Sequence, residues 1–246
     1  WSILSVTFTK KAANEMKERA IKLESRAEAS QIRTFHSFGS WFLRKYYEAA
    51  VLEPSFTVYD DDDMETILKK AVPSLSKKEV KLAAHQISLA KDYCLTPEDD
   101  LGFLGSEFDI NQIYFEYQKR LKATGNADFG DLIMLPTVLL EKDSQIASYI
   151  HNRFKVVMVD EYQDSNIAQY RLLQKISGIE NGNDSYVCVV GDDDQSIYHF
   201  RGAEVQNILT FPQKFPGTQI IRLEKNYRST ASILKAAEIV VKKNQD

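Results

Sequence analysis

The sequence is poor in the features that mark disulfide-bonded, zinc-binding or membrane-spanning proteins. Its 246 residues include only two cysteines, Cys94 and Cys188, with no CxxC pair or Cys/His cluster around either. The chain therefore offers neither a zinc site nor a disulfide framework, and a reducing intracellular setting is expected. No apolar run approaches the roughly 18 residues that a transmembrane helix requires, so we expect no membrane partner.

The chain also lacks a starting methionine, a signal-peptide pattern, internal repeats and low-complexity segments. It opens inside an apolar stretch, SILSVTF, so we expect the sequence to be a piece of a longer protein. Hydrophobic residues make up 43% of the chain and aromatic residues 11%, which is typical of a globular fold. The length suits one large domain or two ordinary ones.

Neither sign of charge dominates the chain. The formal net charge of −4 would argue against a nucleic-acid partner if the charge were evenly spread. However, residues 1–46 carry nine Lys/Arg against four Asp/Glu, residues 47–150 carry ten against nineteen, and residues 151–246 carry twelve of each. The basic opening segment suits contacts to phosphates, although a solvated helix face explains its lysines equally well. Net charge alone does not identify the partner.

Four apolar stretches predict β-strands, and each is followed by polar or aromatic residues and then by a helical pattern. They are SILSVTF (2–8), KVVMV (155–159), YVCVV (186–190) and TQIIRL (218–223). The second has no polar alternation, which is typical of a parallel strand buried on both faces. Alternating strands and helices predict a mostly parallel sheet, whose ligands bind outside the carboxyl ends of the strands.

The stretch between the first two of these strands predicts several helices. Asp60–Asp63 precede one helical pattern, and acids at a helix start complement the backbone dipole, so we interpret them as a cap rather than a metal site. SKKE at 76–79 predicts a capping box. Thr-Pro at 96–97 indicates another start, and a further helix is expected from a cap at Asp109 to a stop at Gly125.

Five further segments resemble, in order, motifs Ia, Ib, II, III and IV of superfamily 1 DNA helicases of the UvrD/Rep/PcrA group. The segments are VTFTKKAANEMKER (6–19), TFHSF (34–38), VDEYQDSN (159–166), VGDDDQSIYHFRGA (190–203) and LEKNYRST (223–230). The resemblance covers nearly the whole chain apart from the helical stretch. It implies an ATP-dependent 3′–5′ helicase or translocase that uses ATP and Mg²⁺ and acts on single-stranded DNA and single-strand/duplex junctions.

The resemblance also implies the fold and its division into domains. We expect an α/β fold with a RecA-like parallel sheet core and an inserted α-helical subdomain. The core domain 1A would comprise residues 1–49 and 128–222, the α-helical insertion 1B residues 50–127, and a truncated start of domain 2A residues 223–246. The segment DFGDLI (128–133) is similar to the place where the family's chain returns to the core.

The resemblance assigns the ATP site to residues of motifs II, III and IV. Hydrolysis of a nucleoside triphosphate needs one carboxylate to help hold Mg²⁺ and a second to activate or position water. By resemblance, Asp160 is the Mg²⁺ ligand and Glu161 the catalytic base, both at the carboxyl end of a strand. Gln195 would sense the γ-phosphate. Tyr227 would stack on the adenine, and Arg228 would neutralise charge on the γ-phosphoryl group.

Motifs Ia, Ib and III supply the expected DNA contacts. These residues are Phe8, Thr9, Thr34, His36, Ser37, Tyr198, Phe200 and Arg201. Hydroxyl groups and backbone N–H groups at a helix start suit phosphates, and aromatic rings stack on bases whatever the sequence. Alternatives remain open: Tyr198 and Phe200 could pack in a core, His36 could be structural, and Gln163 with Asp164 could link neighbouring motifs or only shape a turn.

One part of the family pattern is missing. None of the ten glycines is followed by lysine, so the chain contains no GxxxxGK[ST] phosphate loop. The resemblance implies that this loop precedes the first strand, so we expect the chain alone to lack ATPase activity. Two alternatives are the helicase subunit of a helicase–nuclease and a module that binds DNA without hydrolysis. We expect an intracellular, DNA-associated location, in the cytoplasm, nucleoid or nucleus, and the sequence predicts no oligomeric state.

Overall fold

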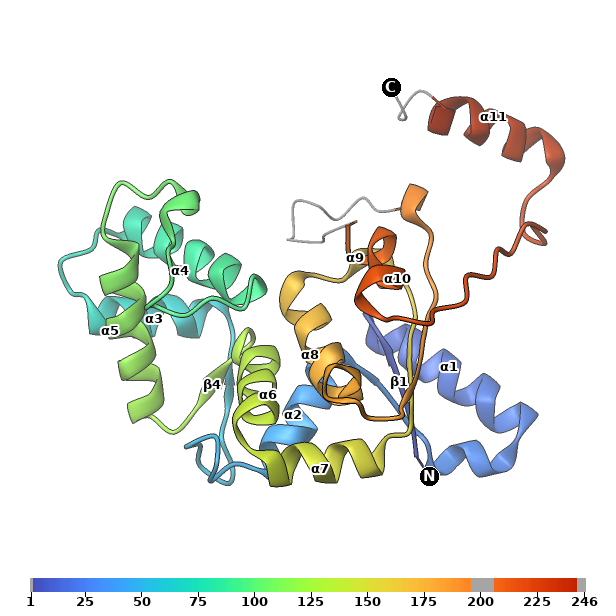
Figure 1. Cartoon of the computed structure of the whole chain (residues 1–246). Coiled ribbons are helices and arrows are strands. Elements are labelled where there is room, and N and C mark those ends of the chain that lie inside the picture. Colours follow the sequence, from blue (N-terminus) through green and yellow to red (C-terminus); the bar gives the residue numbers. More distant parts are fainter. Residues whose placement is uncertain (1, 196–205, 243–246) are drawn as a thin grey trace.

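The computed structural model describes residues 2–195 and 206–242, which are arranged around a four-stranded parallel sheet (Figure 1). The strand order is β2-β1-β5-β6, and every neighbouring pair is parallel. The strands are β1 (Ile3–Thr7), β2 (Gln31–Thr34), β5 (Val156–Val159) and β6 (Tyr186–Val189). Helices flank this sheet, so the predicted α/β fold with a RecA-like parallel core and a helical insertion is confirmed.

The carboxyl ends of the four strands lie level with one another. Thr7 of β1 is in register with Thr34 of β2. Val6 of β1 is in register with Val159 of β5, which is itself in register with Val189 of β6. Because all four strands run in the same direction, the segments that follow them emerge at one edge of the sheet. This register brings together segments that are far apart in the sequence.

Helices lie on both sides of the sheet. In Figure 1, α1 (Lys10–Leu23) lies on the opposite side of β1 from α2 and α8. The larger group comprises α2 (Phe35–Lys45), α6 (Asp131–Lys142), α7 (Ser144–Arg153) and α8 (Ile167–Ser177). Apolar residues of this group pack with Leu4, Val6, Val157 and Val159 of the sheet into the main hydrophobic cluster. This cluster anchors the strand ends that carry the motifs.

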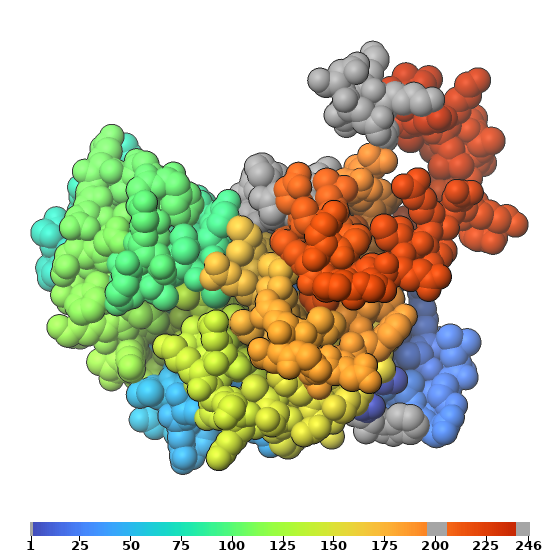
Figure 2. All heavy atoms as spheres, in the orientation of Figure 1, coloured from blue at the N-terminus to red at the C-terminus, as the bar shows by residue number. Residues whose placement is uncertain are grey.

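The helical insertion forms a second lobe with its own apolar interior, on the left of Figures 1 and 2. Its elements are β3 (Val58–Tyr59), α3 (Asp61–Ala71), α4 (Lys77–Asp92), α5 (Ile110–Ala123) and β4 (Ala127–Asp128). Strands β3 and β4 pair in parallel as a separate small sheet. Leu68, Ala83, Ile87 and Tyr117 belong to a second hydrophobic cluster, distinct from the one under the main sheet. The domain limits given above stay predictions.

The helix starts predicted for the insertion are largely confirmed. The side chain of Asp60 accepts a hydrogen bond from the backbone N–H of Asp63, and the side chain of Asp63 accepts one from the backbone N–H of Asp60. Ser76 and Glu79 form the same reciprocal capping box. Asp109 caps α5 through its side chain. These caps involve residues only three positions apart, which is why the local sequence reveals them.

Three expectations are wrong. Residues 218–223 form an irregular, largely exposed segment instead of a strand, because the described residues place no strand beside it to complete its backbone hydrogen bonds.

Strand β5 is not buried on both faces: Val157 and Val159 are buried, whereas Met158 is 37% exposed. The described helices thus leave one face of β5 partly open. Residues 96–97 lie in a turn and begin no helix.

The last described elements are short helices and one longer helix. They are α9 (Gln206–Leu209), α10 (Phe211–Lys214) and α11 (Ala231–Lys242). Phe211 and Phe215 belong to the main hydrophobic cluster, whereas α11 stands apart from the sheet in Figure 1 and exposes Ile233 and Ile239. In the described part of the chain, no helix has the length and apolar character needed to cross a membrane.

Candidate functional site

The carboxyl end of β5 leads into a tight turn that is fixed to both neighbouring strands. The backbone N–H of Asp160 donates to the carbonyl of Val6 at 2.9 Å. The backbone N–H of Tyr162 donates to the carbonyl of Val190, next to β6, also at 2.9 Å. Between these anchors Glu161 adopts a left-handed backbone conformation with φ of 54°. Because this conformation costs a non-glycine residue roughly 1–2 kcal/mol, it is typical of residues held in place for function.

The turn concentrates negative charge. Burial, together with the charge of Glu161, raises the pKa of Asp160 above its usual value. The same two causes raise the pKa of Asp164 at the end of the turn. A raised carboxyl pKa means that the ionised group lacks full compensation, so a positive charge placed here would be favoured.

Several polar atoms at this edge are buried without a partner. Asp164 Oδ1 and the hydroxyls of Thr7 and Tyr162 have no hydrogen-bond partner among the described residues. Within residues 2–195 and 206–242, no cluster of three or more acidic, His or Cys side chains could hold a metal by itself. Mg²⁺ in nucleotide sites commonly uses only one or two carboxylates, together with phosphates and water. Asp160 therefore fits a Mg²⁺ that is shared with a bound nucleotide.

Gln163 joins this turn to the segment that follows β6. Its side chain is buried, and Nε2 donates to Oε2 of Glu161 at 2.9 Å. Its Oε1 accepts from the backbone N–H of Asp192 at 3.1 Å. A Cβ atom on Gly191 would lie only 2.5 Å from Gln163 Oε1, so glycine permits this close approach. Gln163 was expected either to link neighbouring motifs or only to shape a turn, and its hydrogen bonds to Glu161 and Asp192 link motif II to motif III.

The other motif III residues are only partly described. Gln195 ends a short 3₁₀ turn, η5 (Asp193–Gln195), and its amide donates to the carboxylate of Asp192. Asp192 thereby connects Gln195 to Gln163, which in turn contacts Glu161. Tyr198, Phe200 and Arg201 lie outside the described residues.

The motif IV residues are not brought to the carboxylates. Tyr227 is 85% exposed, and Arg228 is also exposed, in the irregular segment before α11. The side chain of Asn226 accepts from the backbone N–H groups of Arg228 and Ser229, which forms a local turn. Within the described chain, no hydrogen bond or ion pair joins Tyr227 or Arg228 to Asp160 or Glu161. Their roles in nucleotide binding stay predictions.

Three of the expected DNA-binding hydroxyl residues act in helix caps. Thr9 Oγ1 accepts from the backbone N–H of Ala12 at 3.1 Å and caps α1. Thr34 and Ser37 form a reciprocal capping box at the start of α2, with contacts of 3.1 Å and 2.9 Å. Both helix starts lie at the same sheet edge as Asp160. Their free N–H groups could receive a phosphate, while the hydroxyls maintain the helix ends.

Aromatic rings line the same edge of the sheet. Phe8 is half-buried and meets Phe35 edge-on, with ring centroids 5.6 Å apart. His36 stacks on Phe129, with centroids 4.0 Å apart and planes inclined by 23°. Burial lowers the pKa of His36 to about 4, so its ring is neutral at pH 7 and cannot act as a cation for phosphate.

The sequence interpretation did not identify Phe129. Its ring is 57% exposed, which is unusual for a phenylalanine two residues before a helix that packs in the core. It lies between Asp128 and Gly130 in DFGDLI, and an aromatic residue flanked by polar and glycine residues at a helix start was the available signal. The stacked pair of His36 and Phe129 offers an exposed ring face beside motif Ib.

Comparisons with known proteins identify relatives of this chain. A family model described as the UvrD/REP helicase N-terminal domain matches residues 1–216. The chain is 41% identical over 259 residues to "ATP-dependent DNA helicase UvrD1" of Mycobacterium tuberculosis, an alignment covering 98% of this chain and 33% of the relative. It is 39% identical over 249 residues to "ATP-dependent DNA helicase Rep" of Escherichia coli, covering 98% and 36%.

A third relative is "ATP-dependent DNA helicase PcrA" of Bacillus subtilis, 37% identical over 254 residues, with 100% of this chain and 34% of the relative covered. The chain thus spans about a third of the length of the curated relatives that it matches. The family match includes β1 through α10 and every described strand. The chain belongs to the UvrD/REP helicase N-terminal domain family.

Proposed function

We propose that this chain forms part of an ATP-dependent DNA helicase that moves 3′ to 5′ along single-stranded DNA and acts at single-strand/duplex junctions. The observation that carries the proposal is the turn after β5, where the strained Glu161 lies beside Asp160 at the sheet edge. Membership of the UvrD/REP family and relatives named as ATP-dependent DNA helicases support the same activity. Such a protein would act inside the cell, wherever its DNA substrate lies.

In this proposal the two carboxylates have different tasks. Asp160 would bind Mg²⁺, which when present would neutralise charge on the phosphates. Glu161 would accept a proton from the water that attacks the γ-phosphorus. Gln163 donates to one oxygen of Glu161 and would hold the other in position for that water. The backbone anchors of Asp160 and Tyr162 would keep the turn from shifting during turnover.

Residues from motifs III and IV would complete the ATP site. Gln195, connected to the turn through Asp192 and Gln163, would report the presence of the γ-phosphate. Tyr227 would stack on the adenine and Arg228 would contact the γ-phosphoryl group. The large exposure of Tyr227 is compatible with a ring that becomes covered when nucleotide binds.

The DNA would cross the same edge of the sheet. Phe8 and the stacked pair of His36 and Phe129 supply rings, and the starts of α1 and α2 supply backbone N–H groups. Thr9, Thr34 and Ser37 would contact the DNA backbone from those helix starts, and the motif III residues Tyr198, Phe200 and Arg201 keep their predicted DNA contacts. Stacking contributes about 1–3 kcal/mol per base and tolerates any sequence.

The test uses the full-length protein that carries this chain. A duplex with a 3′ single-stranded tail and one with a 5′ tail are incubated with ATP and Mg²⁺, and strand separation is measured. We expect unwinding of the 3′-tailed duplex only, and none when a non-hydrolysable analogue replaces ATP. Equal unwinding of both substrates would contradict the proposed polarity. DNA binding without ATP hydrolysis would favour the binding module, and degradation of the displaced strand would favour a helicase–nuclease.

A further inference from the structure

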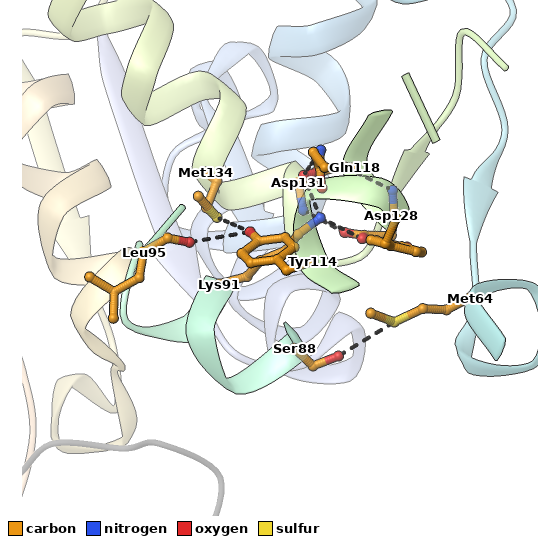
Figure 3. Close-up of polar contacts among 10 residues, drawn as sticks. Met64, Ser88, Lys91, Leu95, Tyr114, Gln118, Asp128, Asp131 and Met134 are labelled. Atoms are coloured by element: carbon orange, nitrogen blue, oxygen red, sulfur yellow. Dashed lines mark hydrogen bonds and ion pairs between the residues drawn. The ribbon is translucent and has the colours of Figure 1, made fainter. Parts of the chain in front are cut away.

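The end of α4 in the helical insertion is fixed to the core at successive residues. Lys91 Nζ lies 2.5 Å from Asp128 Oδ2 and 2.7 Å from Asp131 Oδ1, at the end of β4 and the start of α6 (Figure 3). Its side chain is only 1% exposed. This buried ion pair fixes the end of α4 against α6.

The next residue of α4 makes a contact with a different helix. Asp92 Oδ1 accepts a hydrogen bond from Asn166 Nδ2 at 2.7 Å. Two residues further, the carbonyl of Cys94 accepts from Arg171 at 3.4 Å, and Cys94 itself has a positive φ of 58°. Asn166 and Arg171 both belong to the start of α8 or its first turns. The insertion therefore contacts α8 directly where that helix leaves motif II.

Asn166 is the N-cap of α8, and its amide must have one orientation to serve that purpose. Its Oδ1 accepts from the backbone N–H of Gln169 at 2.9 Å, and Gln169 Oε1 accepts from the backbone N–H of Asn166 at 3.2 Å. If the amide rotated by 180°, the Nδ2 group would face Gln169 N–H and the cap would be lost. By accepting from Nδ2, Asp92 selects the orientation that caps the helix.

The same cap is connected by hydrogen bonds to the turn after β5 that carries Glu161. Ser165 Oγ donates to the carbonyl of Tyr162 at 2.7 Å, and Asn207 Nδ2 donates to the carbonyl of Ser165 at 3.0 Å. All of these groups are buried. Asn166 is thus linked through its peptide-bonded neighbour Ser165 to Tyr162, which follows Glu161.

Asp92 is half-buried, and the cost of partly desolvating its carboxylate argues that the contact is more than packing. Burial raises the pKa of Asp92 to about 6. A partly desolvated carboxylate is costly unless its oxygens accept hydrogen bonds, and Asp92 Oδ1 accepts one from Asn166. The acid at this position thus supplies a directional acceptor for one particular amide.

We propose that Asp92 is a positioning residue through which the helical insertion sets the placement of Glu161, by fixing the side-chain amide of Asn166 at the start of α8. The proposal rests on the proposed ATPase function. The connection runs from Asp92 to Asn166 by a hydrogen bond, to Ser165 by the peptide bond and to Tyr162 by a second hydrogen bond. It gives the insertion a route to the turn after β5 that involves no contact with ATP.

The first test measures kinetics of the full-length protein. Asp92→Ala should lower the kcat of DNA-stimulated ATP hydrolysis by roughly tenfold, less than the ~10²-fold that a 1 Å misplacement can produce. KM for ATP and Kd for single-stranded DNA should change less than about twofold, since no ligand contact is lost. Asp92→Asn, whose side-chain oxygen can still accept from Asn166, should retain most of the activity. Asp62→Ala, at an exposed acid of α3, serves as the matched control.

The second test asks whether Asp92 acts through Asn166. If it does, the double variant Asp92→Ala/Asn166→Ala should have the same kcat as Asn166→Ala alone, because the two changes break one connection. Independent, multiplicative losses would overturn the proposal. So would an Asp92→Ala variant with normal kcat, or one in which kcat, DNA affinity and melting temperature all fall together.

A third readout separates this inference from the proposed function. Amide hydrogen exchange in the first turn of α8 should be faster in Asp92→Ala than in the parent protein and unchanged in Asp62→Ala. Faster exchange in a protein without any ATPase would refute the proposed function but keep the link between insertion and α8. Unchanged exchange alongside normal ATPase of Asp92→Ala would refute the link and leave the proposed function standing.

Discussion

Gln163 donates a hydrogen bond from its side-chain amide to Oε2 of Glu161, at 2.9 Å, from a position that is almost completely buried. This contact orients a carboxylate that is otherwise exposed, and it depends on a donor rather than on side-chain bulk. The first prediction concerns this donor.

Gln163→Glu in the full-length protein should reduce ATP turnover about as strongly as Gln163→Ala, by roughly tenfold or more. A glutamate has nearly the same shape but cannot donate at neutral pH, and its charge would repel Glu161. The measurement is steady-state ATPase with saturating single-stranded DNA. Gln145→Ala, at an exposed glutamine of α7, should have no effect. Normal turnover of Gln163→Glu would show that the hydrogen bond does not orient the base.

Lys91→Met should destabilise the chain by about 3–5 kcal/mol, because it leaves Asp128 and Asp131 buried without their cation. Burial and the neighbouring Asp128 already raise the pKa of Asp131, which indicates how little compensation remains. Urea unfolding monitored by circular dichroism gives the free energy. Lys81→Met removes a surface lysine whose distance to Glu65 is 4.0 Å, and it should cost less than about 1 kcal/mol. Equal effects of the two variants would contradict the assigned importance of the buried pair.

Gly39→Ala should be strongly destabilising, by about 3 kcal/mol or more. A Cβ atom at this position of α2 would lie 1.7 Å from the carbonyl oxygen of Leu132 in α6. Backbone atoms cannot rotate away, so the two helices would have to separate. Thermal unfolding would show the loss, and Ser40→Ala on the same helix provides the comparison. An unchanged melting temperature for Gly39→Ala would mean that α2 and α6 do not pack as closely as described.

His36 should make stability depend on pH in a defined direction. Its pKa is lowered to about 4 in the folded state by burial, while in the unfolded chain it has the ordinary value near 6.5. Below about pH 6.5 the unfolded state therefore binds the proton more readily, so this contribution to stability is present above that pH and lost as the pH falls towards 4. The loss attributable to His36 at pH 5 is about 2 kcal/mol.

The pH prediction is checked by comparing unfolding free energies at about pH 7.5 and pH 5. His36→Phe keeps a ring for Phe129 and should reduce the acid-induced loss, whereas His85→Gln, at an exposed histidine of α4, should leave it unchanged. Asp92 contributes in the opposite direction, because its raised pKa makes the folded state bind a proton more readily as the pH falls. This contribution is the same in the variant and the parent protein, so it cancels when their acid-induced losses are compared. An identical loss of stability in acid for His36→Phe and the parent would refute the neutral, half-buried state of His36.

Features of the fold that depend on residues close together in the sequence could be predicted from the sequence. The caps at Asp60, Ser76 and Asp109 follow from side chains and backbone groups three positions apart. The prediction of a strand at 218–223 was wrong, because a strand also needs a neighbouring strand for its backbone hydrogen bonds, and local composition does not show whether one is present. The open face of β5 at Met158 depends on where helices pack, which the apolar run did not reveal.

The candidate site shows the same division. The motifs indicated Asp160 and Glu161, and their turn does emerge beside the ends of β1 and β6. The stacking of His36 on Phe129 and the contact of Asp92 with Asn166 join residues 93 and 74 positions apart, and no spacing rule connects them. Each contact depends on how elements far apart in the sequence pack against one another in the folded chain.

The most direct test of the account is the DNA-stimulated ATPase of the full-length protein carrying Glu161→Gln. Glutamine keeps the size of the side chain but cannot accept the proton, so turnover should fall at least ~10²-fold while ATP and Mg²⁺ still bind. Asp160→Asn, measured in parallel, should also weaken Mg²⁺-dependent nucleotide binding. If Glu161→Gln hydrolyses ATP at nearly the normal rate, Glu161 is not the base, and the strained turn after β5 has a structural role instead.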